Sequence, residues 1–466
     1  MNTGFTPPLT RQVQVPSLPH AKACYLGHMN AATYPTLRAQ AQQTLLANRR
    51  TGFTVPTQRL YPFQWNWDAG FICLGYNHFQ VELAIEELRS LFAGQWANGM
   101  LPHILFHSEH ETSYFPNHDV WQPEVNPGAP RRPRSSGISQ PPVHGFVLEA
   151  LWSQHPAHPG VQGLVRDLWP RLLALHRFWY QQRDPQREGL VSILHPWESG
   201  RDNSPLWDGP LDAIEIAPGT LPPYQRRDTE LVDAAERPTQ AHYDRYVYLL
   251  ALARRHRYEG AALLAETPFL IQDPMLNAIL LHSQAALIRL GEELGKDVGE
   301  LRAWQQQSQQ AFEAKLWHEA LGCYVCYDLR AQAQLPAWEI GGLCGLLAGS
   351  ASPARATRIT DSLRRLRQRG FRLCPSFDVD HARFDARRYW RGPVWPQMNW
   401  LLVRGLTAYG HHALAQQVAQ DLIELVAEAG FYEYFDPRPA GQLVGPRGCG
   451  GHHFSWTAAC VLDLMG

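Results

Sequence analysis

The sequence predicts an all-α protein, a helical toroid of the (α/α)6-barrel type with long ordered loops around an active site. About a dozen segments repeat apolar residues at spacings of three and four, as one face of a helix requires. Few segments alternate apolar and polar residues as half-buried strands do. No internal repeat is detectable, so the sixfold number of hairpins follows from the periodicity alone.

Helical periodicity is clear in the second of these segments, where Val81, Ala84, Ile85, Leu88 and Leu91 share one predicted face. The predicted helices cover residues 33–48, 81–91, 143–154, 161–182, 242–255, 274–294, 301–316, 338–347, 354–369, 394–408, 413–429 and 454–464. Apolar and amphipathic helices alternate along the chain, which is typical of helices inside a ring and helices that cover it.

Four segments rich in aromatic residues, glycine or proline lead directly into apolar helices. They are 61–70 (YPFQWNWDAG), 136–145 (SGISQPPVHG), 388–400 (RYWRGPVWPQMNW) and 451–456 (GHHFSW). In a barrel of helical hairpins the inner helices run the same way, so the loops before them open on one face. We therefore expect these segments to line a common funnel.

One domain accounts for most of the chain. The 466 residues would suffice for two or three ordinary domains, but the Pro-rich stretches at 127–133 and 218–223 are short and unlike Gly/Ser tethers. We predict a single catalytic barrel over residues 31–466, preceded by a Pro-rich lead-in over residues 1–30.

Charge and cysteine content argue against several classes of partner. Lys plus Arg (42) balance Asp plus Glu (43), which argues against nucleic acid and against a basic membrane-binding surface. No signal peptide or membrane span is recognisable, so we expect a cytoplasmic protein. Eight cysteines, with one CxxC at Cys323 and Cys326, and 21 histidines show no metal-ligand spacing, so no metal or other cofactor is predicted. A homo-oligomer is left open.

Aromatic loops indicate a sugar ligand, because flat rings stack on sugar rings while N–H and O–H groups bind the hydroxyls. The 16 Trp and 17 Tyr are enriched where helical periodicity is interrupted. Trp65 and Trp67 would share one face of an extended segment, which leaves Asp68 to bind hydroxyls or to cap the next helix. The group Tyr389, Trp390, Arg391 and Trp395 either faces a ligand or packs around a Gly-Pro turn.

One candidate carboxyl group comes from residues 195–210, where Glu198 and Asp202 stand among tryptophans. Desolvation by aromatic rings raises the pKa of a carboxyl and so suits a general acid. Capping of a turn by Asp202, with Asn203 and Ser204, is the alternative interpretation.

The second candidate is Glu433, flanked by Tyr432 and Tyr434, whose hydroxyls could orient an ionised base. Asp436 stands before Pro437 and is typical of a turn. An inverting glycosidase separates its two carboxyl groups by roughly 6.5–9.5 Å and a retaining one by about 5 Å, a distance that a sequence does not contain.

Five motifs together resemble glycoside hydrolase family 63 and its trehalase-like relatives. QWNWDAGF, ESGRDNSPLWD, YWRGPVWPQMNWLL, FYEYFDP and FSWTAA occur in that order, and within the family they are most similar to the bacterial mannosylglycerate and glucosylglycerate hydrolases. The resemblance runs from about Tyr61 to the C-terminus. It implies an (α/α)6 barrel, inversion at the anomeric carbon, Asp202 as general acid and Glu433 as general base.

The resemblance also implies the groups that bind substrate. On the sugar side it matches Tyr61, Trp65, Trp67, Asp68, Trp197 and Trp395; on the leaving-group side it matches Gln140, Arg237, Tyr243, Tyr389 and Trp390, and more loosely Tyr114. An arginine and tyrosine hydroxyls suit the carboxylate of glycerate. A structural ion pair of Arg237 with Glu236 is the alternative.

The expected reaction is inverting hydrolysis of glucosylglycerate or mannosylglycerate to free sugar and glycerate. One alternative is a trehalase or α-glucosidase acting on a neutral α-glucoside. A sugar phosphorylase using Arg226, Arg227, Arg388 and Arg391 for phosphate, and a non-catalytic glycan-binding protein, are the others. Glucose and mannose differ at one hydroxyl, and the sequence does not distinguish them.

Overall fold

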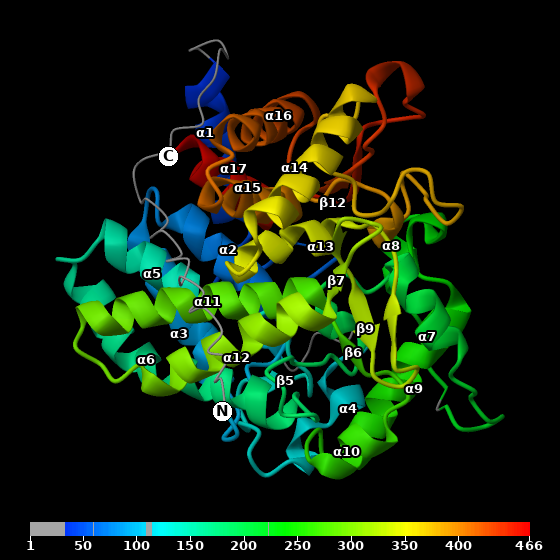
Figure 1. The fold of residues 1–466 in the computed structure, drawn as a ribbon. Coiled ribbons are helices and arrows are strands. Elements are labelled where there is room, and N and C mark those ends of the chain that lie inside the picture. Colours follow the sequence, from blue (N-terminus) through cyan, green and yellow to red (C-terminus); the bar gives the residue numbers. More distant parts are fainter. Residues whose placement is uncertain (1–32, 59, 109–113, 222) are drawn as a thin grey trace, which may run out of the picture.

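The computed structural model describes residues 33–58, 60–108, 114–221 and 223–466, and helices predominate among them (Figure 1). The predicted lead-in over residues 1–30 lies outside the described residues. The first described helix, α1 (Thr33–Ala47), packs against the last, α17 (Ser455–Met465), so the two ends of the described chain meet.

Six helical segments form a closed inner ring in which each packs against the next and α17 packs against α2. The ring consists of α2 (Asn66–Tyr76), α5 (His144–Gln154), α11 (Pro274–Glu293), α13 (Ile340–Leu343) with the 3-10 helix η5 (Cys344–Ala348), α15 (Pro396–Ala408) and α17. Every residue of α2 and nearly every residue of α17 is buried. This burial explains their apolar sequences, because an inner helix is covered on all sides.

A second layer of helices covers this ring. It consists of α1, α3 (Val81–Ala93), α6 (Pro159–Gln182), α12 (Gly299–Lys315), α14 (Pro353–Gln368) and α16 (His412–Ala429). These helices are amphipathic: in α3, Val81, Leu88 and Leu91 are buried while Glu82 and Arg89 are exposed. The alternation of inner and outer helices along the chain is that of the predicted (α/α)6 barrel.

One predicted helix, over residues 338–347, is only partly α-helical, since it consists of the four-residue α13 followed by the 3-10 helix η5. The backbone here lies against Tyr324: a Cβ added at Gly342 would stand 2.1 Å from the Tyr324 carbonyl oxygen, and one at Gly345 would stand 2.3 Å from its ring. The glycines permit this close approach but lower helix propensity, so the α-helix is short.

Short antiparallel strands brace the connections between helices. They pair as β1 (Arg49–Arg50) with β2 (Phe53–Thr54), β3 (Gln64–Trp65) with β4 (Ile104–Phe106) and β5 (Arg134–Ser135), β6 (Ile271–Gln272) with β9 (Cys326–Asp328) and β10 (Ala333–Leu335), β7 (Trp317–His318) with β8 (Cys323–Tyr324), and β11 (Tyr432–Phe435) with β12 (Gly448–His452). A bridge between Val394 and Phe435 joins the loop before α15 to β11. Loops that precede neighbouring inner helices therefore support one another.

The connection from α6 to α11 is long and lies to one side of the ring, on the right in Figure 1. It contains the helices α7 (Asp208–Asp212), α8 (Asp228–Leu231), α9 (Gln240–Arg255) and α10 (Ala261–Glu266), and the 3-10 helices η2 (Pro196–Ser199), η3 (Pro205–Trp207) and η4 (Ala234–Glu236). The remaining short helices lie in other loops: α4 (His118–Trp121), η1 (Pro123–Val125), η6 (Tyr389–Arg391) and η7 (Ala440–Gln442).

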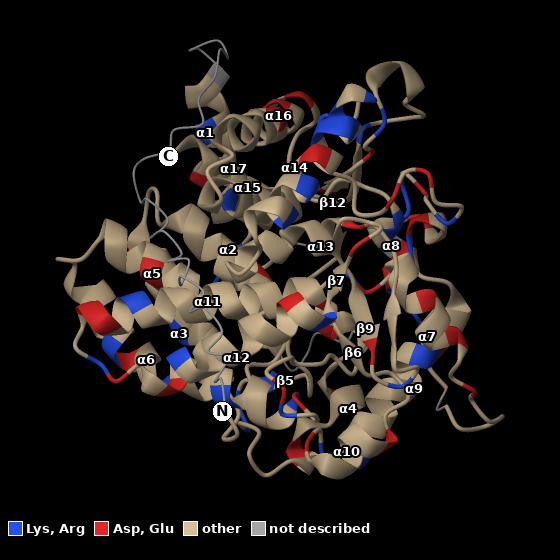
Figure 2. Ribbon diagram, viewed as in Figure 1, with Lys and Arg blue, Asp and Glu red and all other residues tan. Residues whose placement is uncertain are grey.

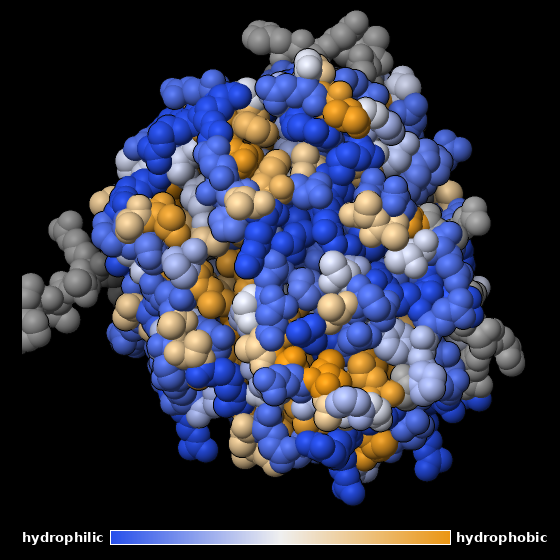
Figure 3. All heavy atoms as spheres, turned by 90° about the vertical axis from the view of Figure 1, so that its right-hand side faces the viewer, coloured by the Kyte–Doolittle hydropathy of each residue, from blue (hydrophilic) through white to orange (hydrophobic). Residues whose placement is uncertain are grey.

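The surface has no region of a single charge sign in the view of Figure 2, where basic and acidic residues are interspersed over the helices. The side formed by the α6–α11 connection is mostly hydrophilic, with small separate hydrophobic patches (Figure 3). In the part of the chain that the structure describes, no helix is long and apolar enough to cross a membrane.

A buried glutamate of α3 lies behind the strand that leads into α2. The Gln64 side-chain amide donates to Glu87 Oε1 at 2.6 Å, and its oxygen accepts from Ser90 Oγ at 3.1 Å and pairs with His107 Nε2 at 2.8 Å. Burial raises the pKa of Glu87 to about 8. Glu87 is therefore mostly protonated at neutral pH.

We predict that Glu87 makes the protein less stable as pH rises from about 5 to 8. A carboxyl with a raised pKa binds its proton more tightly in the folded state, so this contribution is present at low pH and is lost as pH rises through about 8. Urea unfolding at pH 5, 6.5 and 8 should show a shallower decline for Glu87→Gln than for wild type. Glu86→Gln, at an exposed neighbour paired with Arg49, should keep the wild-type slope; parallel curves for all three proteins would contradict the prediction.

Candidate active site

A cavity of about 430 Å³ lies among the loops that precede the inner helices. Every residue predicted for the site lines it, with the exception of Trp395. The segment before α2 and its first turn contribute Tyr61, Trp65, Trp67 and Asp68; later segments contribute Tyr114, Gln140, Trp197, Asp202, Arg237, Tyr243, Tyr389, Trp390 and Glu433. The loops therefore meet at one end of the barrel, because the inner helices that they precede run the same way.

Trp395 stands behind the cavity wall. Its ring stacks on Trp390 at a centroid distance of 3.7 Å and an angle of 3°, and on Tyr434 at 4.7 Å. Its indole N–H donates to the Tyr389 carbonyl oxygen at 3.2 Å. Trp395 thus supports the rings of the wall from outside, and the alternative of packing around the Gly-Pro turn describes it better than ligand contact.

Asp202 lies on the cavity wall between η2 and η3 and is half-buried. Burial raises the pKa of its carboxyl to about 7; the nearby Glu433 adds to the rise, and the positive charge of Arg237 opposes it. The capping role considered for Asp202 belongs to its neighbour, since Ser204 Oγ accepts the N–H of Leu206 at 3.4 Å at the start of η3. Asp202 is left facing the cavity.

The residue before Asp202 is anchored by a buried ion cluster. The Arg201 guanidinium donates to Asp273 Oδ1 at 2.6 Å and to the Glu339 carboxylate, and all three side chains are buried. The Trp207 indole N–H donates to the Arg201 carbonyl oxygen at 2.6 Å, and the Tyr246 hydroxyl donates to the carbonyl oxygen of Asp202 itself. The backbone that carries Asp202 is therefore held on both sides.

Glu198, the other acid considered for this loop, does not line the cavity. Its carboxylate accepts the N–H groups of Leu194 at 2.9 Å and Ser139 at 3.2 Å, and the Arg183 guanidinium lies 3.3 Å away. A fully buried carboxylate with three donors stabilises the loop. Asp202 is the carboxyl of this segment that a ligand can reach.

Glu433 is a buried residue of β11 that lines the cavity, and its carboxylate accepts two hydrogen bonds. The Tyr61 hydroxyl donates to Oε1 at 2.8 Å and the Gly451 N–H donates to Oε2 at 2.9 Å. Burial raises the pKa of Glu433, whereas the charge of Arg237 and both hydrogen bonds lower it. These donors favour the ionised form. Asp436 pairs with Arg438 instead and lies outside the cavity, as its predicted turn role requires.

Arg237 is a buried cation on the cavity wall and is only 3% exposed. One guanidinium N–H donates to the Tyr61 hydroxyl at 3.0 Å, and the group lies over the ring of Tyr389 at 4.7 Å. Its Nε and Nη2 have no hydrogen-bond partner within the described residues. The ion pair with Glu236 considered from the sequence is wrong, because Glu236 binds Arg387 at 3.1 Å.

Asp68 stands in the first turn of α2, where its carboxyl accepts its own backbone N–H, and the N-cap position belongs to Trp65. Burial, followed by the charge of Glu433, raises its pKa well above the ordinary value. The adjacent Trp67 N–H donates to Gln140 Oε1 at 3.3 Å, which joins the loop before α2 to the loop before α5. A buried acid in the cavity without a capping role suits hydrogen bonding to a polar ligand.

Sequence reasoning missed several residues of the cavity wall. His103, Phe115, Phe454 and Trp456 line the cavity but were not singled out. Phe454 and Trp456 lie within residues 451–456, a segment expected from the sequence to line the funnel, although neither was named as a site residue. His103 stacks on Trp197 at 6.1 Å, a contact that no local pattern indicates.

Comparison with known proteins identifies the family. The mannosylglycerate hydrolase MGH1-like glycoside hydrolase domain matches residues 61–457. The chain is 42% identical to the mannosylglycerate hydrolase of Thermus thermophilus, over 91% of this chain and 99% of that protein. It is 31% identical to the glucosylglycerate hydrolase of Mycolicibacterium hassiacum, over 94% of this chain and 100% of that protein.

A solved structure agrees with this relationship. A family 63 mannosylglycerate hydrolase from Thermus thermophilus, in complex with Tris and D-glycerate, superposes with a TM-score of 0.85 at 41% identity and covers 92% of this chain and 99% of that chain. The similarity confirms the predicted (α/α)6 barrel. The chain therefore belongs to the mannosylglycerate hydrolase MGH1-like glycoside hydrolases of family 63.

Proposed function

We propose that the protein hydrolyses an α-linked glycosylglycerate, with mannosylglycerate as the first choice and glucosylglycerate as the second, and inverts the anomeric carbon. The observation that carries the choice of leaving group is Arg237, a buried cation with two unpartnered N–H groups on the wall shared with Asp202 and Glu433. The relatives of this protein include hydrolases of mannosylglycerate and of glucosylglycerate, and the chain is more similar in sequence to the mannosylglycerate hydrolase, at 42% identity against 31%.

In the proposed reaction Asp202 gives its proton to the glycosidic oxygen as the bond to the anomeric carbon breaks. Glu433 takes a proton from a water molecule that attacks the opposite face of the oxocarbenium-like sugar. The two carboxyl groups suit these parts, since burial raises the pKa of Asp202 to about 7, while Tyr61 and Gly451 donate to Glu433 and favour its ionised form. The products are free sugar and glycerate.

Arg237 is proposed to receive the carboxylate of the leaving glycerate, with Gln140, Tyr114, Tyr243 and Tyr389 nearby. A carboxylate there would form charge-assisted hydrogen bonds with these donors, which are stronger than those that the hydroxyls of a neutral leaving group can form. It would also offset the charge that lowers the pKa of Asp202, which keeps the acid protonated in the complex. A neutral disaccharide, the trehalase alternative, uses neither effect.

Three of the four arginines considered for a phosphorylase bind carboxylates, and the fourth, Arg388, donates to the Arg237 carbonyl oxygen at 3.3 Å. Arg226 binds Asp228 at 2.7 Å, Arg227 binds Glu230 at 3.0 Å and Arg391 binds Asp208 at 2.6 Å. Water is therefore the better-supported acceptor. A non-catalytic sugar-binding role is disfavoured because two carboxyl groups with different surroundings line one cavity. Seven described cysteines are free and buried, which supports the proposed cytoplasmic location.

Asp202→Asn and Glu433→Gln should each abolish turnover of mannosylglycerate and glucosylglycerate while circular dichroism and thermal unfolding stay near those of wild type. Neither substitution changes side-chain volume much, but one removes the proton donor and the other the base. Proton NMR of the wild-type reaction should show the β-anomer of the free sugar first. Near-normal rates in either variant, or retention of the α-anomer, would refute the assignment.

Arg237→Gln should weaken binding of the charged substrate selectively. Hydrogen bonds to a charged group contribute about 1.5–3 kcal/mol, so KM for mannosylglycerate should rise roughly 10- to 100-fold. Hydrolysis of methyl α-mannoside, which has no carboxylate, serves as the matched control and should change much less. An equal loss of activity on both substrates would mean that Arg237 does not bind the carboxylate of the leaving group.

Gly450→Ala should lower activity by displacing the carboxylate of the proposed base, Glu433. Gly450 has a φ of +69°, and an added Cβ would lie 2.4 Å from Glu433 Oε2. The carboxylate must therefore move, and kcat should fall at least about 10-fold. Gly445→Ala is the matched control, because Gly445 also has a positive φ (+82°) but has no atom within 4 Å of an added Cβ. Equal kinetics for the two variants would count against a positional effect on Glu433.

A further inference from the structure

The segment from Arg201 to Asp208, which carries Asp202, is held by an ion pair at each end. At its start, Arg201 binds Asp273 and Glu339 of the inner ring. At its end, Asp208 begins α7 and binds Arg391, which lies before α15. The first anchor fixes the segment to the barrel, whereas the second joins it to another loop of the cavity.

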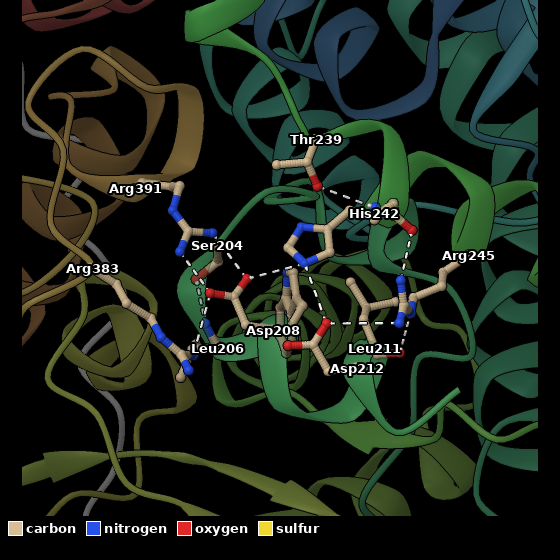
Figure 4. Close-up of polar contacts among 12 residues, drawn as sticks. Ser204, Leu206, Asp208, Leu211, Asp212, Thr239, His242, Arg245, Arg383 and Arg391 are labelled. Atoms are coloured by element: carbon tan, nitrogen blue, oxygen red, sulfur yellow. Dashed lines mark hydrogen bonds and ion pairs between the residues drawn. The ribbon is translucent and has the colours of Figure 1, made fainter. Parts of the chain in front are cut away.

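Asp208 and Arg391 form a bidentate ion pair (Figure 4). Arg391 Nη1 donates to Asp208 Oδ1 at 2.9 Å and Nη2 donates to Oδ2 at 2.6 Å. The two side chains are only 9% and 11% exposed, so the contact is largely desolvated. Arg383 approaches the same carboxylate at 3.3 Å from solvent.

Arg391 closes the turn η6 that presents Tyr389 and Trp390 to the cavity. Tyr389 has a φ of +42°, a left-handed conformation that is costly for a bulky residue and persists only where its surroundings enforce it. The Tyr389 hydroxyl lies 3.3 Å from the Tyr61 hydroxyl, and its ring lies under Arg237. The ion pair to Asp208 holds Arg391, two residues after Tyr389, at the end of this turn.

Helix α9 also packs against α7, beside the Asp208–Arg391 ion pair. His242 Nε2 lies 3.8 Å from Asp208 Oδ1 and 3.8 Å from Asp212 Oδ1, and the next residue, Tyr243, lines the cavity. Arg245 Nε donates to the Leu211 carbonyl oxygen at 2.6 Å, which holds α7 against α9 (Figure 4). Three segments that line the cavity therefore converge on α7.

We propose that Asp208 is a positioning residue, whose ion pair with Arg391 sets the spacing between the loop of Asp202 and the turn of Tyr389. Asp208 does not line the cavity, so it acts through these two elements and touches no substrate. The kinetic part of this inference rests on the proposed function. The mechanical part, that the two segments are coupled through Asp208, does not depend on it.

The first test is kinetic. Asp208→Asn keeps the side-chain shape but removes the charge that fixes Arg391, and kcat for mannosylglycerate should fall roughly 10- to 100-fold with a smaller change in KM. Adding Tyr389→Phe should then cost less than it does in wild type, because both changes act on one arrangement. Independent, additive losses would overturn the proposal.

Glu149→Gln is the matched control. Glu149 and Arg289 form an equally bidentate ion pair, at 2.6 and 2.8 Å, between the inner helices α5 and α11, and neither residue lines the cavity. This variant should lose stability as Asp208→Asn does, with less than about a threefold change in kcat. If both variants lose kcat equally, Asp208 has only a structural role and the proposal fails.

The second test does not need turnover. Hydrogen exchange read by mass spectrometry should accelerate in Asp208→Asn both at residues 203–214 and at residues 385–395, and at neither place in Glu149→Gln. Acceleration confined to residues 203–214 would overturn the coupling. If the wild-type enzyme hydrolyses no glycosylglycerate, the proposed function fails, and this comparison still decides whether the segments are coupled.

A variant without either charge covers the case in which Asp208→Asn does not fold. Asp208→Leu with Arg391→Met removes both partners and leaves no unpaired buried charge. The proposal expects it to fold with the same loss of kcat and the same faster exchange at residues 385–395. Wild-type kcat in this double variant would overturn the proposal.

Discussion

The buried contact of Arg201 with Asp273 and Glu339 is the constraint on which the active site depends. Asp273 also accepts the N–H of Met275 at the start of α11, and Glu339 accepts the N–H groups of Gly341 and Gly342 at the start of α13. One arginine thus joins the N-terminal ends of two neighbouring helices of the inner ring. Negative charge is favourable at those ends, which helps to offset the cost of burying three charged groups.

The consequence for the proposed reaction is that the backbone carrying the proposed acid, Asp202, is held in place. Asp202 follows Arg201 directly, so the ion cluster with the barrel restrains its backbone, as does the hydrogen bond from Tyr246 to its carbonyl oxygen. Glu433 lies far from Asp202 in the sequence. It is held by the pairing of β11 with β12 and by hydrogen bonds from the Tyr61 hydroxyl and the Gly451 N–H. Two carboxyl groups on rigid supports can keep the spacing that an in-line attack by water requires.

Arg237 is the electrostatic centre of the cavity. Its charge lowers the pKa of both Asp202 and Glu433 and of the Tyr61 hydroxyl, against burial, which raises all three. Hydrogen bonding then separates the two acids: Glu433 has two donors, whereas no other described residue donates to the Asp202 carboxylate. Different hydrogen bonding can thus suit one carboxyl to hold a proton and the other to release it.

Local sequence patterns determined most of the helices and the loops that reach the cavity, because burial on all sides requires an apolar helix and burial on one side an amphipathic one. The predicted ranges omit α2 of the inner ring and include residues 242–255, which form α9 outside both layers. The tertiary structure decided what depends on contacts between distant residues. Arg201 meets Asp273 and Glu339 across 72 and 138 positions, and Arg391 meets Asp208 across 183. The side from which Trp395 supports the wall, the shortened α13 against Tyr324 and the unpartnered donors of Arg237 have the same origin. Periodicity records which face of an element is buried, but not which distant group it is buried against.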